Sequence, residues 1–223
     1  MTQQYPLPLP HSTAMEADDY IVTASNREAA TWVNAWPEWP SHCMIILGPA
    51  GSGKTHLVNL WLQKSRGKIV DIEDLATHDA GSLAMSNTII AIDDIASVAG
   101  NDQAEVTLFH LYNLLRETKG YLLLTASRPA AQWNLRLADL RSRILASPVA
   151  SIAPPDDELL TMLLVKQFHD RQVEISKEVI SYLLPRIERT ASALRTLVAD
   201  LDRTSLAEGK PVTVALVRRV LGA

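Results

Sequence analysis

The sequence has little of several features that mark particular classes of protein. Its 223 residues include a single cysteine, Cys43, which excludes an internal disulfide, leaves no cysteine cluster for zinc and favours a reducing compartment. No apolar run approaches the ~20 residues that span a bilayer, and no Lys or Arg precedes Arg27, so the charged start of a signal peptide is missing. We therefore expect a cytoplasmic protein in which Cys43 is an apolar core residue.

An excess of positive charge is also missing. The 21 basic and 25 acidic residues give a formal net charge of −4, whereas proteins that bind a phosphate backbone cluster Lys and Arg and are usually basic. The five tryptophans have no basic residues interleaved with them, so we expect core or interface positions rather than platforms for stacked bases. The composition thus disfavours direct DNA binding.

The chain divides into three parts by pattern. Residues 1–17 contain three closely spaced prolines, which exclude a helix or a central strand and predict a flexible, extended tail. Residues 18–154 alternate apolar strands with helices, which predicts an α/β domain whose parallel sheet has helices on both faces. Residues 155–223, which start at a Pro-Pro pair, show only helical periodicity and hold ten acidic and ten basic residues, so we expect a small, electrically balanced helical domain.

Apolar runs, caps and helix breakers predict the individual elements. The first helix is expected within residues 18–39, starting after Ser25 or Asn26 and stopping at Pro37. Further strands are predicted at residues 43–47, 68–72, 88–92 and 121–126, and further helices at about residues 54–64, 103–118, 156–171, 176–189, 191–208 and 212–221.

The strongest motif follows the strand predicted at residues 43–47. Residues 48–55, Gly-Pro-Ala-Gly-Ser-Gly-Lys-Thr, match the P-loop pattern G-x-x-x-x-G-K-[ST] and open a predicted helix, which is the context that the motif requires. The glycines let backbone N–H groups turn toward phosphate oxygens, and the helix N-terminus adds its positive end. Lys54 would reach the β- and γ-phosphates, while Thr55 would coordinate Mg²⁺. The candidate nucleotide-binding residues here are Gly48, Pro49, Ala50, Gly51, Ser52, Gly53, Lys54 and Thr55.

Polar residues end two further strands. Residues 89–92 lead into Asp93 and Asp94, at the sheet edge where a P-loop protein places its acids. Asp93 would hold magnesium through water and Asp94 would orient the attacking water, although an ordinary polar loop start would look the same. At the end of the strand at residues 121–126, Thr125 and Ser127 are both candidates to contact the γ-phosphate, and a simple hydroxyl turn explains them equally well.

Two arginines are candidates for phosphate contacts. Arg143 lies late in the α/β part, from where it would act in trans, because a guanidinium neutralises charge that develops on a transferring phosphoryl group. Arg195 lies on a predicted helix of the second domain and would fold onto the nucleotide from above. By position alone, an ordinary solvated arginine explains each of them.

Together these residues resemble the AAA+ ATPases, and more narrowly the DnaA-related family, which comprises the replication initiator DnaA and regulatory relatives such as Hda. The likeness spans about residues 16–223 and rests on the strings at residues 53–57, 93–95, 99–113, 124–129, 142–143 and 193–197. It implies a five-stranded sheet in the order 5-1-4-3-2 with a helical lid, Arg143 as an arginine finger, Arg195 as the sensor 2 arginine and Ser127 in the sensor 1 segment. It also implies that His56, Tyr20, Ile21 and Val22 join the nucleotide site, the last three beside the adenine. Without the resemblance, a plain packing role explains Tyr20, Ile21 and Val22 equally well.

The tail carries a separate resemblance. Residues 4–9, Gln-Tyr-Pro-Leu-Pro-Leu, are similar to the sliding-clamp-binding hexapeptide at the start of Hda-type proteins, with Tyr5 in place of the usual leucine. An extended strip stiffened by prolines loses little entropy on binding, and its leucines fill apolar pockets. A terminus without a partner is the alternative. The clamp-binding residues would be Gln4, Leu7, Pro8 and Leu9.

The resemblance therefore implies a regulator of replication initiation that binds ADP or ATP with Mg²⁺, docks on the DNA polymerase III β sliding clamp and stimulates hydrolysis of ATP bound by DnaA. Its own hydrolysis would be weak, and a homo-oligomer, most simply a dimer, is expected. We expect a regulator rather than an initiator because the sequence ends directly after the last lid-like helix, where DnaA continues into a DNA-binding domain. The alternatives are a DnaA-like adaptor that recruits a helicase and a scaffold whose nucleotide only fixes the fold.

Overall fold

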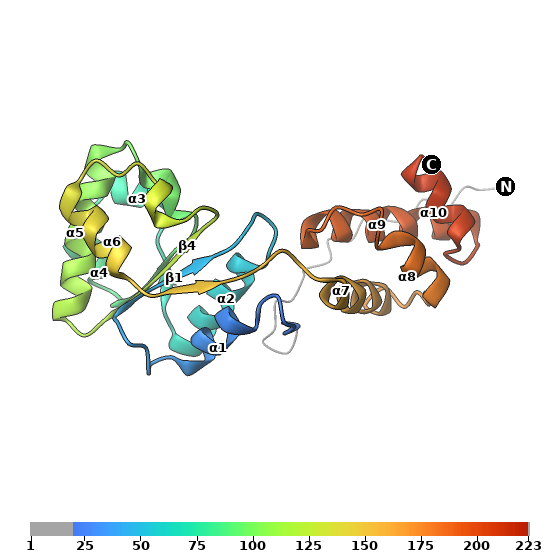
Figure 1. The fold of residues 1–223 in the computed structure, drawn as a ribbon, viewed down its shortest axis with the longest axis horizontal. Coiled ribbons are helices and arrows are strands. Elements are labelled where there is room, and N and C mark those ends of the chain that lie inside the picture. Colours follow the sequence, from blue (N-terminus) through green and yellow to red (C-terminus); the bar gives the residue numbers. More distant parts are fainter. Residues whose placement is uncertain (1–19, 223) are drawn as a thin grey trace.

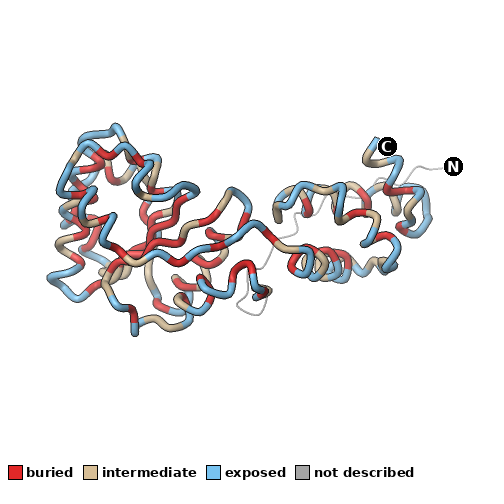
Figure 2. The backbone as a smooth tube through the Cα atoms, in the orientation of Figure 1, coloured by how far each residue is buried: buried red, intermediate tan, exposed pale blue. Residues whose placement is uncertain are grey.

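The computed structural model describes residues 20–222, in which an α/β domain is followed by a helical domain (Figure 1). The tail motif at residues 4–9 lies outside the described residues. Figure 2 shows buried positions gathered in two separate regions, one around the sheet and one among the C-terminal helices. No helix within residues 20–222 is long and apolar enough to cross a membrane.

The α/β domain is built on a parallel sheet. Its strands are β1 (Cys43–Leu47), β2 (Lys68–Ile69), β3 (Ile89–Ile92), β4 (Tyr121–Ala126) and β5 (Val149–Ser151), which pair in the order β2-β3-β4-β1-β5. Read from the other edge, this is the expected order 5-1-4-3-2. Because β1, β3 and β4 lie inside the sheet with helices on both faces, nearly all of their residues are buried, which explains their unbroken apolar runs.

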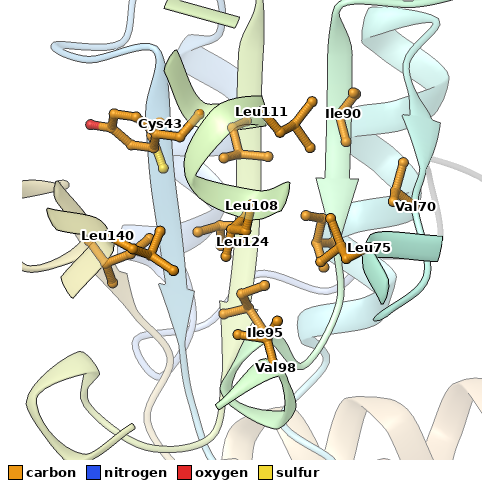
Figure 3. Packing of buried hydrophobic residues seen from close by; sticks show 14 of the residues in the cluster. Cys43, Val70, Leu75, Ile90, Ile95, Val98, Leu108, Leu111, Leu124 and Leu140 are labelled. Atoms are coloured by element: carbon orange, nitrogen blue, oxygen red, sulfur yellow. The ribbon is translucent and has the colours of Figure 1, made fainter. Parts of the chain in front are cut away.

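Helices on one face of the sheet bury the odd-numbered residues of β1. Cys43 packs there in one cluster with Leu108, Leu111 and Leu140 (Figure 3). Burial raises the pKa of the Cys43 thiol to about 12, so this side chain stays neutral in the apolar core, as expected. The elements on this face are α3 (Ile72–Thr77), α4 (Ala80–Ala84), the 3-10 helices η2 (Ile95–Val98) and η3 (Ala130–Gln132), α5 (Asp102–Glu117) and α6 (Ala138–Ala146).

Helices α1 (Arg27–Ala35) and α2 (Lys54–Ser65) cover the opposite face, against the even-numbered residues of β1. Trp61 is fully buried there and stacks on Trp39, with ring centroids 5.4 Å apart. Trp32 and Trp36 pack against the same cluster, and Trp133 is buried on the other face. The tryptophans therefore serve packing, as the sequence predicts.

Three short elements depart from the expectations. The strand expected at residues 68–72 ends at Ile69, because Asp71 and Asp74 form a capping box that starts α3. Helix α4, which is also absent from the predicted elements, begins after Asp79 accepts a hydrogen bond from the Ser82 N–H. Strand β5 gives no apolar run because only its central residue is buried.

The C-terminal helical domain, here called the lid, has its own apolar core. Leu160, Leu164 and Phe168 pack there with Leu194 and Val198. The helix expected at residues 176–189 ends early, two residues ahead of a proline, whereas the one expected at residues 191–208 is confirmed. The lid helices are α7 (Asp157–His169), α8 (Lys177–Leu183), α9 (Ala191–Glu208) and α10 (Val214–Leu221).

Candidate nucleotide-binding site

The P-loop joins β1 to α2 at the carboxyl edge of the sheet. Gly51 and Gly53 have backbone φ angles of +72° and +96°, a left-handed region that a side chain would strain. Inside the loop, the Ser52 hydroxyl is buried without a hydrogen-bond partner among the described residues. A buried polar atom of this kind costs free energy unless it is satisfied, so it marks a position that a ligand oxygen would complete.

The Lys54 side chain folds back into the loop. Its ammonium group donates hydrogen bonds to the carbonyl oxygens of Gly48 at 2.8 Å and Pro49 at 2.9 Å. Burial lowers the pKa of Lys54, and the nearby carboxylates of Asp93 and Asp94 offset part of that shift. The charge is therefore held at the phosphate-facing loop, where an anionic ligand would replace the carbonyl groups as its partner.

Asp93 links three elements at this edge. Its carboxylate accepts a hydrogen bond from the Thr55 hydroxyl at 2.7 Å and a shorter one from the Thr125 hydroxyl. The Thr55 hydroxyl and the Asp93 carboxylate are thus adjacent oxygen donors of the kind that Mg²⁺ prefers. Within residues 20–222 no group of three or more His, Cys, Asp or Glu residues is placed to hold a metal. A magnesium ion here would therefore depend on these two side chains together with phosphate oxygens and water.

The structure separates the two candidates at the end of β4. Thr125 is fully buried, and its hydroxyl bonds Asp93 while it accepts from the Asp94 N–H at 3.0 Å. Ser127 is exposed beyond the end of the strand. Asp94 itself is exposed, with a left-handed φ of 49°, so its carboxylate lies at the surface of the same edge. Thr125 is therefore the hydroxyl that joins the acidic pair to the sheet.

A small pocket next to the P-loop gathers most of the residues expected beside the adenine. Tyr20, Ile21 and His56 line it, and the Tyr20 and His56 rings meet edge to face with centroids 5.2 Å apart. Val22 is 47% exposed and is not part of this lining. The lid and the segment before it supply further lining residues that the sequence does not predict. They are far from the P-loop in sequence, and the apolar spacing of four on one helix is their only signal. These are Pro155, Leu159, Leu163 and Ala191.

The lid touches the P-loop through the start of α9. Its N-cap residue, Thr190, lies so close that a Cβ on Gly51 would come within 2.7 Å of the Thr190 Cβ. The Ala191 N–H also approaches the Gly51 carbonyl at 3.4 Å. Arg195 is exposed one turn further along α9. The structure thus places the helix of the sensor 2 candidate against the P-loop.

A single carboxylate connects the lid to the segment before α1. Asp156 caps α7 by accepting from the Leu159 N–H at 2.7 Å. It also accepts from the Thr23 hydroxyl at 3.0 Å and the Ser25 N–H at 3.2 Å. Burial alone would raise the pKa of Asp156, but these hydrogen bonds outweigh that effect and hold the pKa below its usual range.

Arg143 belongs to the opposite edge of the sheet. Its guanidinium carbon lies 4.9 Å from the centroid of the Phe109 ring and 5.8 Å from that of Tyr112. The Tyr112 ring in turn packs against the ring of His42, the residue before β1, with centroids 4.4 Å apart. Since the P-loop begins after β1, the five-residue strand, about 16 Å long, separates the two sites. Arg143 thus lies toward the amino end of β1, whereas the P-loop follows the carboxyl end of that strand.

Comparisons with known proteins support the fold and the lid. Residues 156–221 match the family model described as the lid domain of Hda. Domain III of the replication initiation protein DnaA from Thermotoga maritima is 19% identical, with a TM-score of 0.81, and the match covers 96% of this chain and 98% of that one. AMPPCP-bound DnaA from Aquifex aeolicus is 20% identical, with a TM-score of 0.71, over 86% of this chain and 66% of that chain.

The likeness extends to a motor protein of the same fold. The RuvB Holliday junction branch migration motor of Thermotoga maritima is 17% identical, with a TM-score of 0.65, over 80% of this chain and 60% of that chain. At these identities the structural matches establish the fold, and the family model adds a likeness of the lid to that of Hda. The chain thus shares the AAA+ fold of DnaA domain III, and its residues 156–221 are similar to the lid domain of Hda.

Proposed function

We propose that this protein regulates replication initiation by binding adenine nucleotide and by presenting Arg143 to ATP bound by DnaA, whose hydrolysis it stimulates. The observation that carries the proposal is the position of Arg143 at the sheet edge opposite its own P-loop. A guanidinium that lies toward the amino edge of the sheet, away from the P-loop at the carboxyl edge, would serve a phosphoryl group that belongs to another molecule.

The nucleotide itself would be ADP or ATP. The P-loop backbone, Lys54 and the unsatisfied Ser52 hydroxyl form the phosphate cradle, and the pocket around Tyr20 and His56 would receive the base. Thr55 and Asp93 would hold Mg²⁺, which when bound neutralises charge on the phosphates. Asp94 would orient water, and Arg195 would approach the phosphates from the lid.

The protein's own hydrolysis would be weak. Nothing on the described part of the chain brings an arginine from the opposite edge to its P-loop, so a lone molecule lacks the positive charge that completes the site. A second copy or DnaA would have to supply it. The proposed partners are therefore DnaA, a second copy of this chain and, through Gln4, Leu7, Pro8 and Leu9, the DNA polymerase III β sliding clamp. Support for the clamp contact comes from the sequence pattern alone.

The decisive test substitutes the arginine finger. We expect Arg143→Ala to lower the stimulated hydrolysis of DnaA-bound ATP by roughly 10³-fold or more, because arginine fingers contribute factors of about 10³–10⁵. Hydrolysis is measured with DNA-loaded clamp and ADP present. Arg141→Ala, which removes an exposed arginine from the same helix, is the matched control and should retain stimulation. Full stimulation by Arg143→Ala would overturn the proposal.

A second experiment isolates the tail. Deletion of residues 1–10 should abolish co-precipitation with the clamp while nucleotide binding stays unchanged, because the P-loop motif lies at residues 48–55. The matched control replaces only Gln4, Leu7 and Leu9 by alanine and should give the same loss. Undiminished clamp binding by both variants would contradict the clamp contact without affecting the role of Arg143.

A further inference from the structure

The seven arginines of the lid differ in whether they form an ion pair. Four of them form ion pairs: Arg171 with Asp202, Arg189 with Asp157, Arg203 with Asp200 and Arg219 with Glu208. Among the described residues, the remaining three have no carboxylate within 4.0 Å. One is Arg195, the candidate for a nucleotide contact. The other two, Arg186 and Arg218, lie together on the lid.

Arg186 and Arg218 converge on one aromatic ring. The Arg186 guanidinium carbon lies 3.9 Å from the centroid of the Tyr182 ring, and that of Arg218 lies 5.4 Å from it. Tyr182 is on α8 and Arg218 on α10, and these two helices pack together in the lid (Figure 1). Arg186 also donates to the Tyr182 carbonyl at 2.9 Å, which fixes its orientation. We call this group, Arg186, Tyr182 and Arg218, the lid arginine pair.

The lid arginine pair is electrostatically incomplete. Two guanidinium groups on one ring repel each other, and the ring quadrupole offsets only part of that repulsion. Both side chains are exposed. An anion that contacts both would relieve the repulsion, and it would lose little entropy because the ring and the backbone hydrogen bond already hold the cations in place. We propose that the lid arginine pair binds a short acidic segment of a partner protein through the carboxylates of that segment.

The surroundings favour carboxylates of a protein over a nucleic-acid backbone. Arg219, which follows Arg218 in the sequence, is already engaged with Glu208, as is Lys210. Nucleic-acid binders contact several phosphates in a row, and the net charge of −4 opposes a polyanion further. Planar guanidinium groups match carboxylates in bidentate geometry, and Tyr with Arg is the composition of a protein-interface hot spot.

The test measures binding of a fluorescent acidic peptide to the full-length protein. The probe is about ten residues long with four glutamates, and its counterpart carries glutamines at the same positions. We expect binding of the glutamate peptide only, with affinity reduced at least tenfold in Arg186→Gln/Arg218→Gln. Arg203→Gln removes an equal charge from an arginine that is already paired, and it should change the affinity less than twofold.

A third variant separates the ring from the charge. Tyr182→Leu keeps apolar volume beside the lid core but removes the aromatic face, so we expect a roughly threefold loss of affinity with the lid still folded, as monitored by thermal unfolding. No binding by the wild-type protein, an equal loss in Arg203→Gln, or equally tight binding of single-stranded DNA through the same two arginines would overturn the proposal. Neither the P-loop nor Arg143 enters this experiment, so its outcome is independent of the regulation of DnaA.

Discussion

The two edges of the sheet handle charge in opposite ways. At the carboxyl edge, Lys54 donates a hydrogen bond to the Gly48 carbonyl. The Asp93 carboxylate accepts hydrogen bonds from the hydroxyls of Thr55 and Thr125. At the amino edge, Arg143 rests on two aromatic rings, and its buried Nε has no hydrogen-bond partner among the described residues. The first arrangement is self-contained and ready to exchange its partners for a ligand. In the second, Arg143 keeps a buried Nε that the described residues leave without a partner.

After Arg143→Ala, the largest expected effect comes from a substitution at the carboxyl edge. Lys54→Ala should weaken binding of a fluorescent ADP analogue roughly 10- to 100-fold, because hydrogen bonds to charged groups contribute about 1.5–3 kcal/mol. Lys64→Ala, on the same helix but bonded to the Asn34 carbonyl, is the matched control. Unchanged ADP binding in the Lys54 variant would show that the loop does not hold phosphate.

The link between the acidic pair and the sheet gives the next effect. Thr125→Val removes the hydroxyl that donates to Asp93 and accepts from the Asp94 N–H. We expect the free energy of unfolding to fall by about 1–3 kcal/mol, since buried polar partners are left unsatisfied. Urea unfolding measures this loss. Ser127→Ala, which changes an exposed hydroxyl, should leave stability as it is, and equal values for the two variants would contradict the role of Thr125.

A smaller effect breaks the amino edge. Phe109→Leu keeps an apolar side chain but removes a ring from beneath the Arg143 guanidinium. Since contacts between a cation and an aromatic ring contribute about 0.5–2 kcal/mol, the stimulated hydrolysis of DnaA-bound ATP should fall roughly 2- to 30-fold. ADP affinity, measured in parallel, should not change, because Phe109 does not line the pocket beside the P-loop. A loss of ADP binding would show that the two edges are not separate.

The smallest effect concerns His42, which lies beside Tyr112 at the amino edge. Burial lowers the pKa of His42, and the charges of Arg116 and Arg143 act in the same direction against a backbone hydrogen bond that raises it. The unfolded chain therefore takes up a proton more readily than the folded one, so stability falls as the pH drops below about 6.5.

The matching measurement is the difference in the free energy of unfolding between pH 7.5 and pH 5.5. His42→Gln should reduce that difference by no more than about 1.4 kcal/mol for each unit of pKa shift. His169→Gln, an exposed histidine of the lid, is the control. An unchanged difference in His42→Gln would contradict the assignment of this pH dependence to His42.

The sequence predicts those parts of the molecule whose signal is continuous. Strands β1 and β4 have the predicted bounds because each is an unbroken buried run, and the P-loop residues are contiguous. Strand β5 is not predicted, because a single buried residue gives no hydrophobic pattern. Helices α3 and α4 are not predicted either, because each begins at a local aspartate cap. The strand order came from the family resemblance rather than from the pattern.

The site shows the same division. Thr55 and Asp93 are recognisable from their motifs, but only the fold shows that Thr125 rather than Ser127 joins them. The lid side of the pocket, with Leu159 and Leu163, is assembled by a domain more than 100 residues away from the P-loop in sequence. Packing of distant segments decides such contacts, and no local spacing encodes them.

The carboxylate of Asp156 has a mechanical consequence. Because it caps α7 and at the same time holds Thr23 and Ser25, the lid cannot rotate about its first helix without carrying that segment along or breaking both hydrogen bonds. Asn26, in turn, bonds the Ile21 carbonyl at 2.8 Å. One carboxylate therefore ties the first helix of the lid to the segment that forms the wall of the pocket beside Ile21.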